Sequence, residues 1–220
     1  DMTYYNLHTH DLSPSTDRKL SICNLPYKKR FISPDTCPGV YFSAGIHPWH
    51  IASTDPMSLT LQLSRIAESP QLLAIGECGL DKLTDTPMDI QETIFKQQIE
   101  IAESSKKPMI IHCVKAFNEL IKLRKETAAR QEWIIHGFRG KPQLAAELIQ
   151  HGFRISIGYK FNPETAETIP LHRLFLETDD SNNTDIETIY RQIAEIRQIP
   201  ENELIISIGT SFSELFGLSR

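Results

Sequence analysis

The sequence of 220 residues predicts an α/β fold in the form of a (β/α)8 barrel, and three observations lead to this prediction. Short apolar runs recur along the chain, and such runs are typical of parallel strands that are buried on both faces. Segments with apolar residues at helical spacing separate most of these runs, as in alternating strand and helix units. Polar residues follow the same end of several runs, where a barrel of this kind carries its functional side chains.

The first half of the chain predicts a barrel with a shortened start. We expect the first strand to begin at Tyr4 and to end at His10. Residues 11–38 contain four prolines, and only residues 20–24 among them could form a second strand. A full connecting helix does not fit before that strand. The barrel is therefore expected to be trimmed between its first strand and its third, which we place at residues 40–46.

Helices and strands alternate regularly after the third strand. Asp55-Pro56 has the pattern of an N-cap and a first helical residue, and the helix that it opens should close at Pro70. Gly152 is expected directly after a later helix, where a left-handed residue commonly ends it. We expect the remaining strands at residues 72–77, 109–112, 133–136, 153–158 and 174–178, and the remaining helices at residues 88–104, 116–130, 142–150, 185–196 and 201–216. With eight strand candidates, the chain should form one domain over residues 1–220 with the fold of a TIM barrel.

The composition narrows the class of protein. The chain has 23 Lys and Arg residues against 28 Asp and Glu residues, a net charge of −5. With a pI of about 5.9, broad attraction to a nucleic-acid backbone is not expected, although a local basic cleft is compatible with it. No apolar run approaches the ~20 residues that cross a bilayer, and the N-terminal residues lack the apolar core of a signal peptide, so we expect a soluble, cytoplasmic protein. The sequence leaves the oligomeric state open, and a monomer is favoured. The four cysteines have no CxxC spacing and are expected to be free thiols.

Metal-ligating side chains stand at the ends of several predicted strands. In an extended segment, residues two apart point to the same side, so the imidazoles of His8 and His10 can bind one ion. Similar side chains end later runs, and the carboxyl ends of parallel strands meet at one edge of a barrel. Six nitrogen and carboxylate donors are more than one tetrahedral ion uses, so we expect two divalent cations, with zinc as the first choice and Mn²⁺, Mg²⁺ or Ni²⁺ as alternatives. The candidate metal ligands are His8, His10, Glu77, His112, His136 and Asp179.

Two cations held side by side favour the hydrolysis of a phosphodiester. At a separation of about 3.5–4 Å they activate a bridging water and stabilise both the attacking and the leaving oxygen. We expect Glu77 to bridge the two ions, and Asp179 to bind one ion and to accept the proton of the attacking water. Both carboxylates are therefore candidate catalytic residues.

Other residues near the predicted strand ends are candidates for contact with a substrate. His47 is a candidate catalytic or phosphate-binding residue, with a structural hydrogen bond as the alternative. Lys115 and Arg139 are candidate phosphate contacts, and the alternative is that they are solvated loop charges. Trp49 is expected to pack in the wall of the site rather than to stack on a base. By strand alternation, Glu177 should face away from the site.

The order of these motifs resembles that of the TatD-type metal-dependent deoxyribonucleases, a family of amidohydrolase-like barrels. The pieces at residues 76–81 and 177–179 are together quite specific for that family, whereas either alone would be a weak signal. The matching pieces run in family order over nearly the whole chain, and they are Leu7-His8-Thr9-His10, Gly45-Ile46-His47-Pro48, Ile75 to Asp81, Ile111-His112, His136 to Gly140, Glu177-Thr178-Asp179 and Leu215 to Leu218.

The resemblance implies a barrel that binds two metal ions and hydrolyses phosphodiester bonds, with DNA as the usual substrate of the family. It also implies the division of the ligands. One ion would be held by His8, His10, Glu77 and Asp179, and the other by Glu77, His112 and His136.

The chain departs from the family pattern near the metal ligands. Asn6 stands where the family usually has Asp, and Val114 and Lys115 stand where it favours Arg and Asp. Asp180-Ser181 replaces the usual Ala-Pro or Ser-Pro, and Asp180 is a candidate cap of the next helix or a substrate contact. Because the predicted ligands are all retained, these departures bear on substrate contacts rather than on metal binding.

Two other functions are compatible with the same residues. An amide or lactone hydrolase would direct the same metal-activated water at a carbonyl carbon. A barrel that holds metal without turnover and acts as a binding partner is the second alternative, suggested by Val114 and Asp180. Rates on phosphodiesters, esters and lactones with the same metal distinguish these functions.

Overall fold

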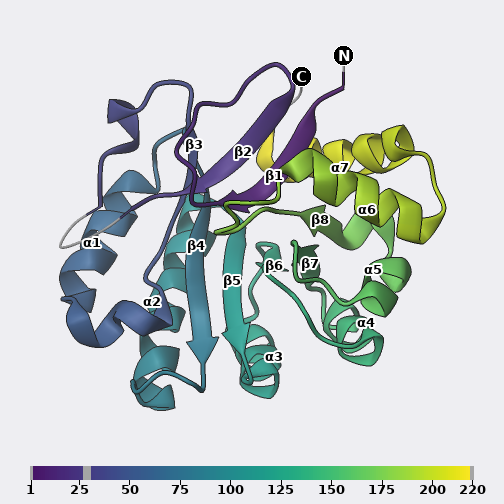
Figure 1. Ribbon diagram of the computed structural model, residues 1–220. Coiled ribbons are helices and arrows are strands. Elements are labelled where there is room, and N and C mark those ends of the chain that lie inside the picture. The colour runs from purple at the N-terminus through teal and green to yellow at the C-terminus, as the bar shows by residue number, and fades with distance from the viewer. Residues whose placement is uncertain (1, 27–30, 219–220) are drawn as a thin grey trace. The chain divides into compact units, whose positions relative to one another are not determined.

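The computed structural model describes residues 2–26 and 31–218, and Figure 1 labels its helices and strands. The chain forms two compact units, unit 1 (Asp1–Cys23 and Ile134–Arg220) and unit 2 (Asn24–Trp133). The described residues contain eight β-strands with helices between most of them, so the predicted α/β class and (β/α)8 arrangement are confirmed. The single domain expected over residues 1–220 stays a prediction. Within the segment predicted to be irregular, residues 27–30 lie outside the described residues.

Unit 1 carries strands from both ends of the chain. Its elements are β1 (Tyr4–Thr9), β2 (Lys19–Asn24), β6 (Trp133–Ile135), α4 (Pro142–Gln150), β7 (Arg154–Ile157), α5 (Pro163–Thr168), η3 (Leu171–Arg173), β8 (Leu174–Leu176), α6 (Ile186–Arg197) and α7 (Glu201–Phe216). β1 pairs in parallel with β2, and β7 pairs in parallel with β6 and β8. A parallel bridge between Thr9 and Asp179 links the end of β1 to the residues that follow β8.

Buried aromatic side chains hold β1 against the C-terminal helices. Helices α6 and α7 lie side by side (Figure 1). Phe212 of α7 meets Tyr5 of β1 and Phe175 of β8, with ring centroids 5.0 and 6.3 Å apart. The hydroxyl of the fully buried Tyr190 donates to the carbonyl of Tyr5 at 2.8 Å and accepts from its N–H at 3.2 Å. These contacts fix the strand that carries His8.

Unit 2 contains the middle of the chain. Its elements are η1 (Pro34–Thr36), β3 (Tyr41–Ala44), η2 (Pro48–Ser53), α1 (Pro56–Ile66), β4 (Leu72–Asp81), α2 (Met88–Ser105), β5 (Met109–Val114) and α3 (Phe117–Thr127). β4 is buried along its whole length and pairs in parallel with β3 and β5, while α2 packs against it. As predicted, Asp55 caps α1, accepting the N–H of Ser58 at 3.2 Å.

Strand β4 is longer than predicted. The sequence predicted an end at Glu77 and a polar loop after it, whereas β4 continues to Asp81 because these residues pair with β5. Gly79 has a φ of +149°, and a Cβ at this position would overlap the carbonyl oxygen of His112. The glycine therefore lets β4 continue directly beside His112.

Replacing Gly79 by Ala is expected to lower the free energy of unfolding by about 3 kcal/mol or more, since the methyl group would both strain the backbone and overlap β5. Gly217→Ala is the matched control. Gly217 also has a positive φ, +67°, but nothing lies within 4 Å of a Cβ there, so a loss of about 1 kcal/mol is expected. Urea denaturation measures both, and equal losses would show that the contact with β5 imposes no constraint.

The other strands and α-helices lie at the predicted places, except that β8 ends at Leu176 rather than at residue 178, and that the 3-10 helices and one α-helix were not predicted. Helix α5 was not predicted, although Asn162-Pro163 has the pattern of a helix start, and the side chain of Asn162 accepts from the N–H groups of Glu164 and Thr165. Among the described residues between β1 and β3 there is no α-helix, so the predicted trimming is confirmed. Gly152 follows α4 with a φ of +86°, as expected. The cysteines are free, and within residues 2–26 and 31–218 no helix has the length and apolar character needed to cross a membrane.

Candidate metal centre

His8, His10 and Asp179 meet in unit 1 at the end of β1. Nε2 of His8 lies 3.3 Å and Nε2 of His10 lies 3.4 Å from the same oxygen, Oδ1 of Asp179. The backbone holds the three residues together, because the N–H of Asp179 donates to the carbonyl of His8 and the N–H of His10 donates to the carbonyl of Asp179. The two imidazoles face one carboxylate, as the alternation of the strand predicted.

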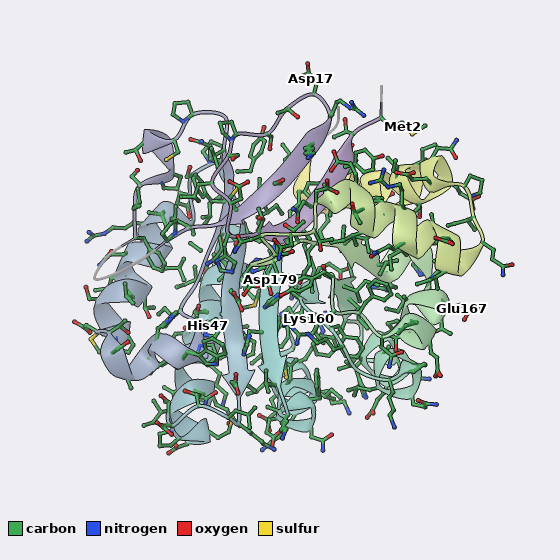
Figure 2. The ribbon with its side chains drawn as sticks, in the orientation of Figure 1. Met2, Asp17, His47, Lys160, Glu167 and Asp179 are labelled. Carbon is green, nitrogen blue, oxygen red and sulfur yellow. The ribbon has the colours of Figure 1, made fainter. Side chains whose placement is uncertain are left out.

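The pKa of the Asp179 carboxyl is held well below its usual range. Burial raises this pKa, but hydrogen bonds from His10 and His8 outweigh that effect, so the group is ionised at neutral pH. The side chain keeps 22% of its surface exposed. It lines a small pocket with Arg139 and Lys160, and Figure 2 labels Asp179 and Lys160. An anionic carboxylate that is partly open to solvent is suited to bind a cation.

His136 joins this cluster and brings with it a buried carboxylate. The ring centroids of His136 and His8 are 4.5 Å apart, and donor atoms of these two residues and Asp179 lie within 4.8 Å of one another. Glu177 was predicted to face away from the site, but its Oε1 lies 3.2 Å from Nδ1 of His136. That prediction was wrong because β8 ends at Leu176, so the alternation of the strand does not extend to Glu177.

Glu177 fixes the orientation of the His136 ring. Its side chain is fully buried, and its Oε1 also accepts the N–H of Gly137 at 2.6 Å. Its Oε2 accepts the hydroxyl of Ser156 at 2.5 Å. Because the carboxylate accepts at both oxygens, Nδ1 of His136 is the donor, and the neutral ring offers Nε2 to an ion.

A second cluster lies in unit 2 around Glu77. Oε1 of Glu77 lies 3.1 Å from Nδ1 of His112 and 3.1 Å from Nε2 of His47. Donor atoms of the three residues lie within 4.8 Å of one another. The Glu77 side chain is only 9% exposed, and a buried carboxylate requires partners of this kind. β4, β5 and the end of β3 thus bring one acid and two imidazoles together.

His47 donates a hydrogen bond to Glu77. Its Nδ1 accepts the backbone N–H of Trp49 at 3.1 Å, so the proton of the neutral ring is on Nε2, which faces Glu77. Burial lowers the pKa of His47, and the hydrogen bond to Glu77 only partly offsets this. Of the roles left open by the sequence, the structure supports the positioning of Glu77 and the capping of η2.

Asp81 is a site residue that the sequence interpretation missed. Its Oδ2 lies 2.8 Å from Nε2 of His112 and accepts the indole N–H of Trp49 at 2.7 Å, while Oδ1 accepts the N–H of Leu83 at 2.8 Å. Asp81 lies four residues beyond Glu77 on β4, and both carboxylates contact the ring of His112. The sequence prediction ended the strand at Glu77 and therefore did not place Asp81 near His112, although Asp81 is the last residue of the motif that begins at residue 76.

The contacts of Asp81 decide how two neighbouring rings are placed. Burial raises the pKa of Asp81, but hydrogen bonds from His112 and Trp49 lower it by more, so the pKa lies below its usual value. His112 therefore donates from Nε2 and turns Nδ1 to Glu77, where it can bind an ion. Trp49 packs beside His47 and His112, as predicted for the wall of the site, but it reaches Asp81 from the surface and is 59% exposed.

The spacing of these atoms fits divalent cations. Zinc bonds of about 2.0–2.2 Å to nitrogen and oxygen place neighbouring ligands of a tetrahedral ion roughly 3.3–3.6 Å apart. The contacts of Asp179 with His8 and His10 and of Glu77 with His112, 3.1 to 3.4 Å, are close to this spacing. Imidazole and carboxylate donors without thiolate suit zinc and manganese, so these residues fit the expected cofactor.

Two positions that depart from the family pattern have defined contacts in unit 1. The side chain of Asn6 donates to the hydroxyl of Thr178 at 2.8 Å and accepts its N–H at 3.1 Å, so it joins β1 to the residues after β8 without adding charge. Asp180 accepts the hydroxyl of Tyr159 at 3.2 Å. The cap of α6 is Asp185, which accepts the N–H of Thr188, and not Asp180.

The structure divides the predicted ligands between the two units. The ligands in unit 1 are His8, His10, His136 and Asp179, and those in unit 2 are Glu77 and His112. Among the predicted substrate contacts, Arg139 lines the pocket beside Asp179, and Lys115 is exposed directly after β5. One centre that joins both sets, with Glu77 shared by two ions, stays a prediction.

Known proteins with similar sequences are metal-dependent hydrolases and nucleases. An uncharacterized metal-dependent hydrolase of Buchnera aphidicola subsp. Baizongia pistaciae is 31% identical over 168 residues, which cover 72% of this chain and 62% of that protein. The 3'-5' ssDNA/RNA exonuclease TatD of Musicola paradisiaca is 36% identical over 154 residues, which cover 64% of this chain and 58% of that protein. The matches thus span less than two thirds of the length of either relative.

The fold and the family model agree with these relatives. The crystal structure of YjjV, a TatD homologue from Escherichia coli K12, superposes with a TM-score of 0.72 at 24% identity, covering 82% of this chain and 78% of that one. This likeness supports the (β/α)8 fold. The model of the family described as TatD related DNase matches residues 31–217, well over half of the sequence. The chain therefore belongs to the TatD related DNase family.

Proposed function

We propose that this chain is a metal-dependent phosphodiesterase that cleaves DNA or a shorter nucleotide chain with the aid of two divalent cations. The observation that carries the proposal is that the carboxylates of Asp179 and Glu77 each lie at ligand spacing from imidazole nitrogens. The names of the relatives, metal-dependent hydrolase and ssDNA/RNA exonuclease, support hydrolysis of nucleic acid. Zinc is the first choice of ion, with manganese, magnesium or nickel as alternatives.

The proposed roles follow from the contacts within each unit. When bound, the ions supply an activated water and neutralise charge on the phosphoryl oxygens. Asp179 would bind one ion and accept a proton from the attacking water, while Glu177 and Asp81 keep the rings of His136 and His112 oriented. As the resemblance to the family implies, one ion would be held by His8, His10, Glu77 and Asp179, and the other by Glu77, His112 and His136.

The substrate contacts are part of the same proposal. Arg139 is exposed and lines the pocket that contains Asp179, so its guanidinium is available to a phosphate of the substrate. Lys115, exposed after β5, completes the proposed phosphate contacts, and His47, predicted as a catalytic or phosphate-binding residue, is proposed to act by positioning Glu77. The cytoplasmic location and the monomeric state expected from the sequence stay predictions.

Removal of metal is expected to abolish cleavage of a short single-stranded DNA, and zinc or manganese should restore it. The measurement is cleavage of an end-labelled oligonucleotide before and after chelation, together with elemental analysis of the purified protein, in which two ions per chain are expected. Cleavage that persists without metal would contradict the proposed function. Turnover of esters or lactones in place of phosphodiesters would favour the amide or lactone hydrolase, and metal binding without turnover would favour the binding protein.

A further inference from the structure

Trp49 is an exposed aromatic side chain that is held in a fixed position. It lies in η2 and is 59% exposed. Its indole N–H donates to Oδ2 of Asp81 at 2.7 Å, and its backbone N–H donates to Nδ1 of His47 at 3.1 Å. A ring that is already oriented loses little freedom when a ligand binds to it.

The indole lies beside the Glu77 cluster. Its ring centroid is 4.8 Å from that of His47 and 5.6 Å from that of His112, with interplanar angles of 65° and 77°. Neither imidazole stacks flat against the indole. Since both imidazoles contact Glu77, Trp49 is adjacent to the residues proposed to bind metal in unit 2.

The two residues after Asp81 expose one apolar side chain and one cation that is already paired. Leu83 is 67% exposed, and its backbone N–H is bound to the other oxygen of Asp81 at 2.8 Å. The neighbouring Lys82 is paired with Glu119. The chain also carries a net charge of −5, which gives little general attraction for an anionic polymer. Contacts that do not depend on charge would therefore add to the phosphate contacts proposed for Lys115 and Arg139.

We propose that Trp49 is the stacking platform for a nucleobase of a single-stranded substrate, next to the phosphodiester that is cleaved. Stacking on an aromatic side chain suits any base, because every base has a π-face, and single-strand binding proteins use it in this way. Asp81 holds the indole in a fixed position beside His112, because its Oδ2 contacts both rings. This inference rests on the proposed function and assigns it a base-binding subsite.

The test compares Trp49→Ala and Trp49→Phe on an oligodeoxythymidylate and on the same oligonucleotide with abasic positions. Trp49→Ala is expected to lower kcat/KM on the intact oligonucleotide by roughly tenfold to a hundredfold and to leave kcat/KM on the abasic one unchanged. Trp49→Phe keeps an aromatic face without the N–H, and it should retain most of the activity. Leu61→Ala, which alters an exposed side chain of α1, is the control and should have no effect.

Two outcomes overturn the proposal. One is an equal loss on intact and abasic oligonucleotides, or an equal loss in the Phe and Ala variants, because the role of Trp49 would then be to hold Asp81. The other is an unchanged kcat/KM in Trp49→Ala on the intact oligonucleotide while the wild-type protein cleaves it. The proposed nuclease activity would then be retained, and the proposed stacking role of Trp49 would be rejected. Binding of a phosphorothioate oligothymidylate is followed by tryptophan fluorescence. Quenching that is lost in Trp49→Phe supports the platform even if cleavage is absent, which would reject only the proposed function.

Discussion

Asp179→Asn is expected to lower kcat for phosphodiester cleavage by about 10³-fold, because it removes both an anionic metal ligand and the proposed proton acceptor. The side chain keeps its size, and its carbonyl oxygen can still accept from one imidazole. The negative charge that faces both His8 and His10 at 3.3 and 3.4 Å is lost. Steady-state kinetics with saturating metal measures the effect.

The matched control for this variant is Asp185→Asn. Asp185 caps α6, and Asn is an equally good cap, so activity should be retained. Since the pKa of Asp179 is lowered in the folded chain, its ionised form stabilises the metal-free protein above about pH 4, and this stabilisation is lost as the pH falls and the group is protonated. The free energy of unfolding of metal-free Asp179→Asn should therefore be reduced at pH 7, with a difference from wild type that shrinks in acid. Full activity in Asp179→Asn would remove Asp179 from the mechanism.

Local patterns in the sequence predicted side-chain direction only where pairing keeps the backbone extended. His8 and His10 face one carboxylate because the bridge between Thr9 and Asp179 pairs the end of β1 with the residues after β8. Glu177 was misplaced because β8 stops one residue before it, at Leu176. Period-two reasoning depends on an extended backbone, and an apolar run does not show where that backbone ends.

Contacts between distant strands lay beyond prediction from the sequence. Asp81 was missed because β4 stays extended past Glu77 through its pairing with β5, and that pairing depends on how closely Gly79 approaches His112. The choice of ring nitrogen in each histidine is likewise set by a partner far along the chain, such as Glu177 for His136. Residue types could be predicted from motif spacing, whereas the orientation of each ligand could not.

Glu77→Gln is expected to lower the metal content of the protein and to reduce kcat/KM by more than about 100-fold. Loss of a residue that only orients a metal ligand costs up to about 100-fold in activity, and loss of a ligand itself should cost more. Gln retains the volume of the side chain, but the group between His47 and His112 becomes neutral. Its carbonyl oxygen can accept from Nε2 of His47, and its amide then presents N–H groups that cannot bind a cation. Elemental analysis and cleavage of a labelled oligonucleotide are the measurements.

Glu126→Gln makes the same chemical change on the surface of α3, where Glu126 is 48% exposed and lies 3.6 Å from Lys122. An exposed pair of this kind contributes little, so metal content and activity should equal those of the wild type. If Glu77→Gln kept its full metal content but lost activity, Glu77 would act on the substrate or the water and not as the shared ligand. If it kept both, the cluster around Glu77 would be structural, and the metal site would have to be built from the residues of unit 1 alone.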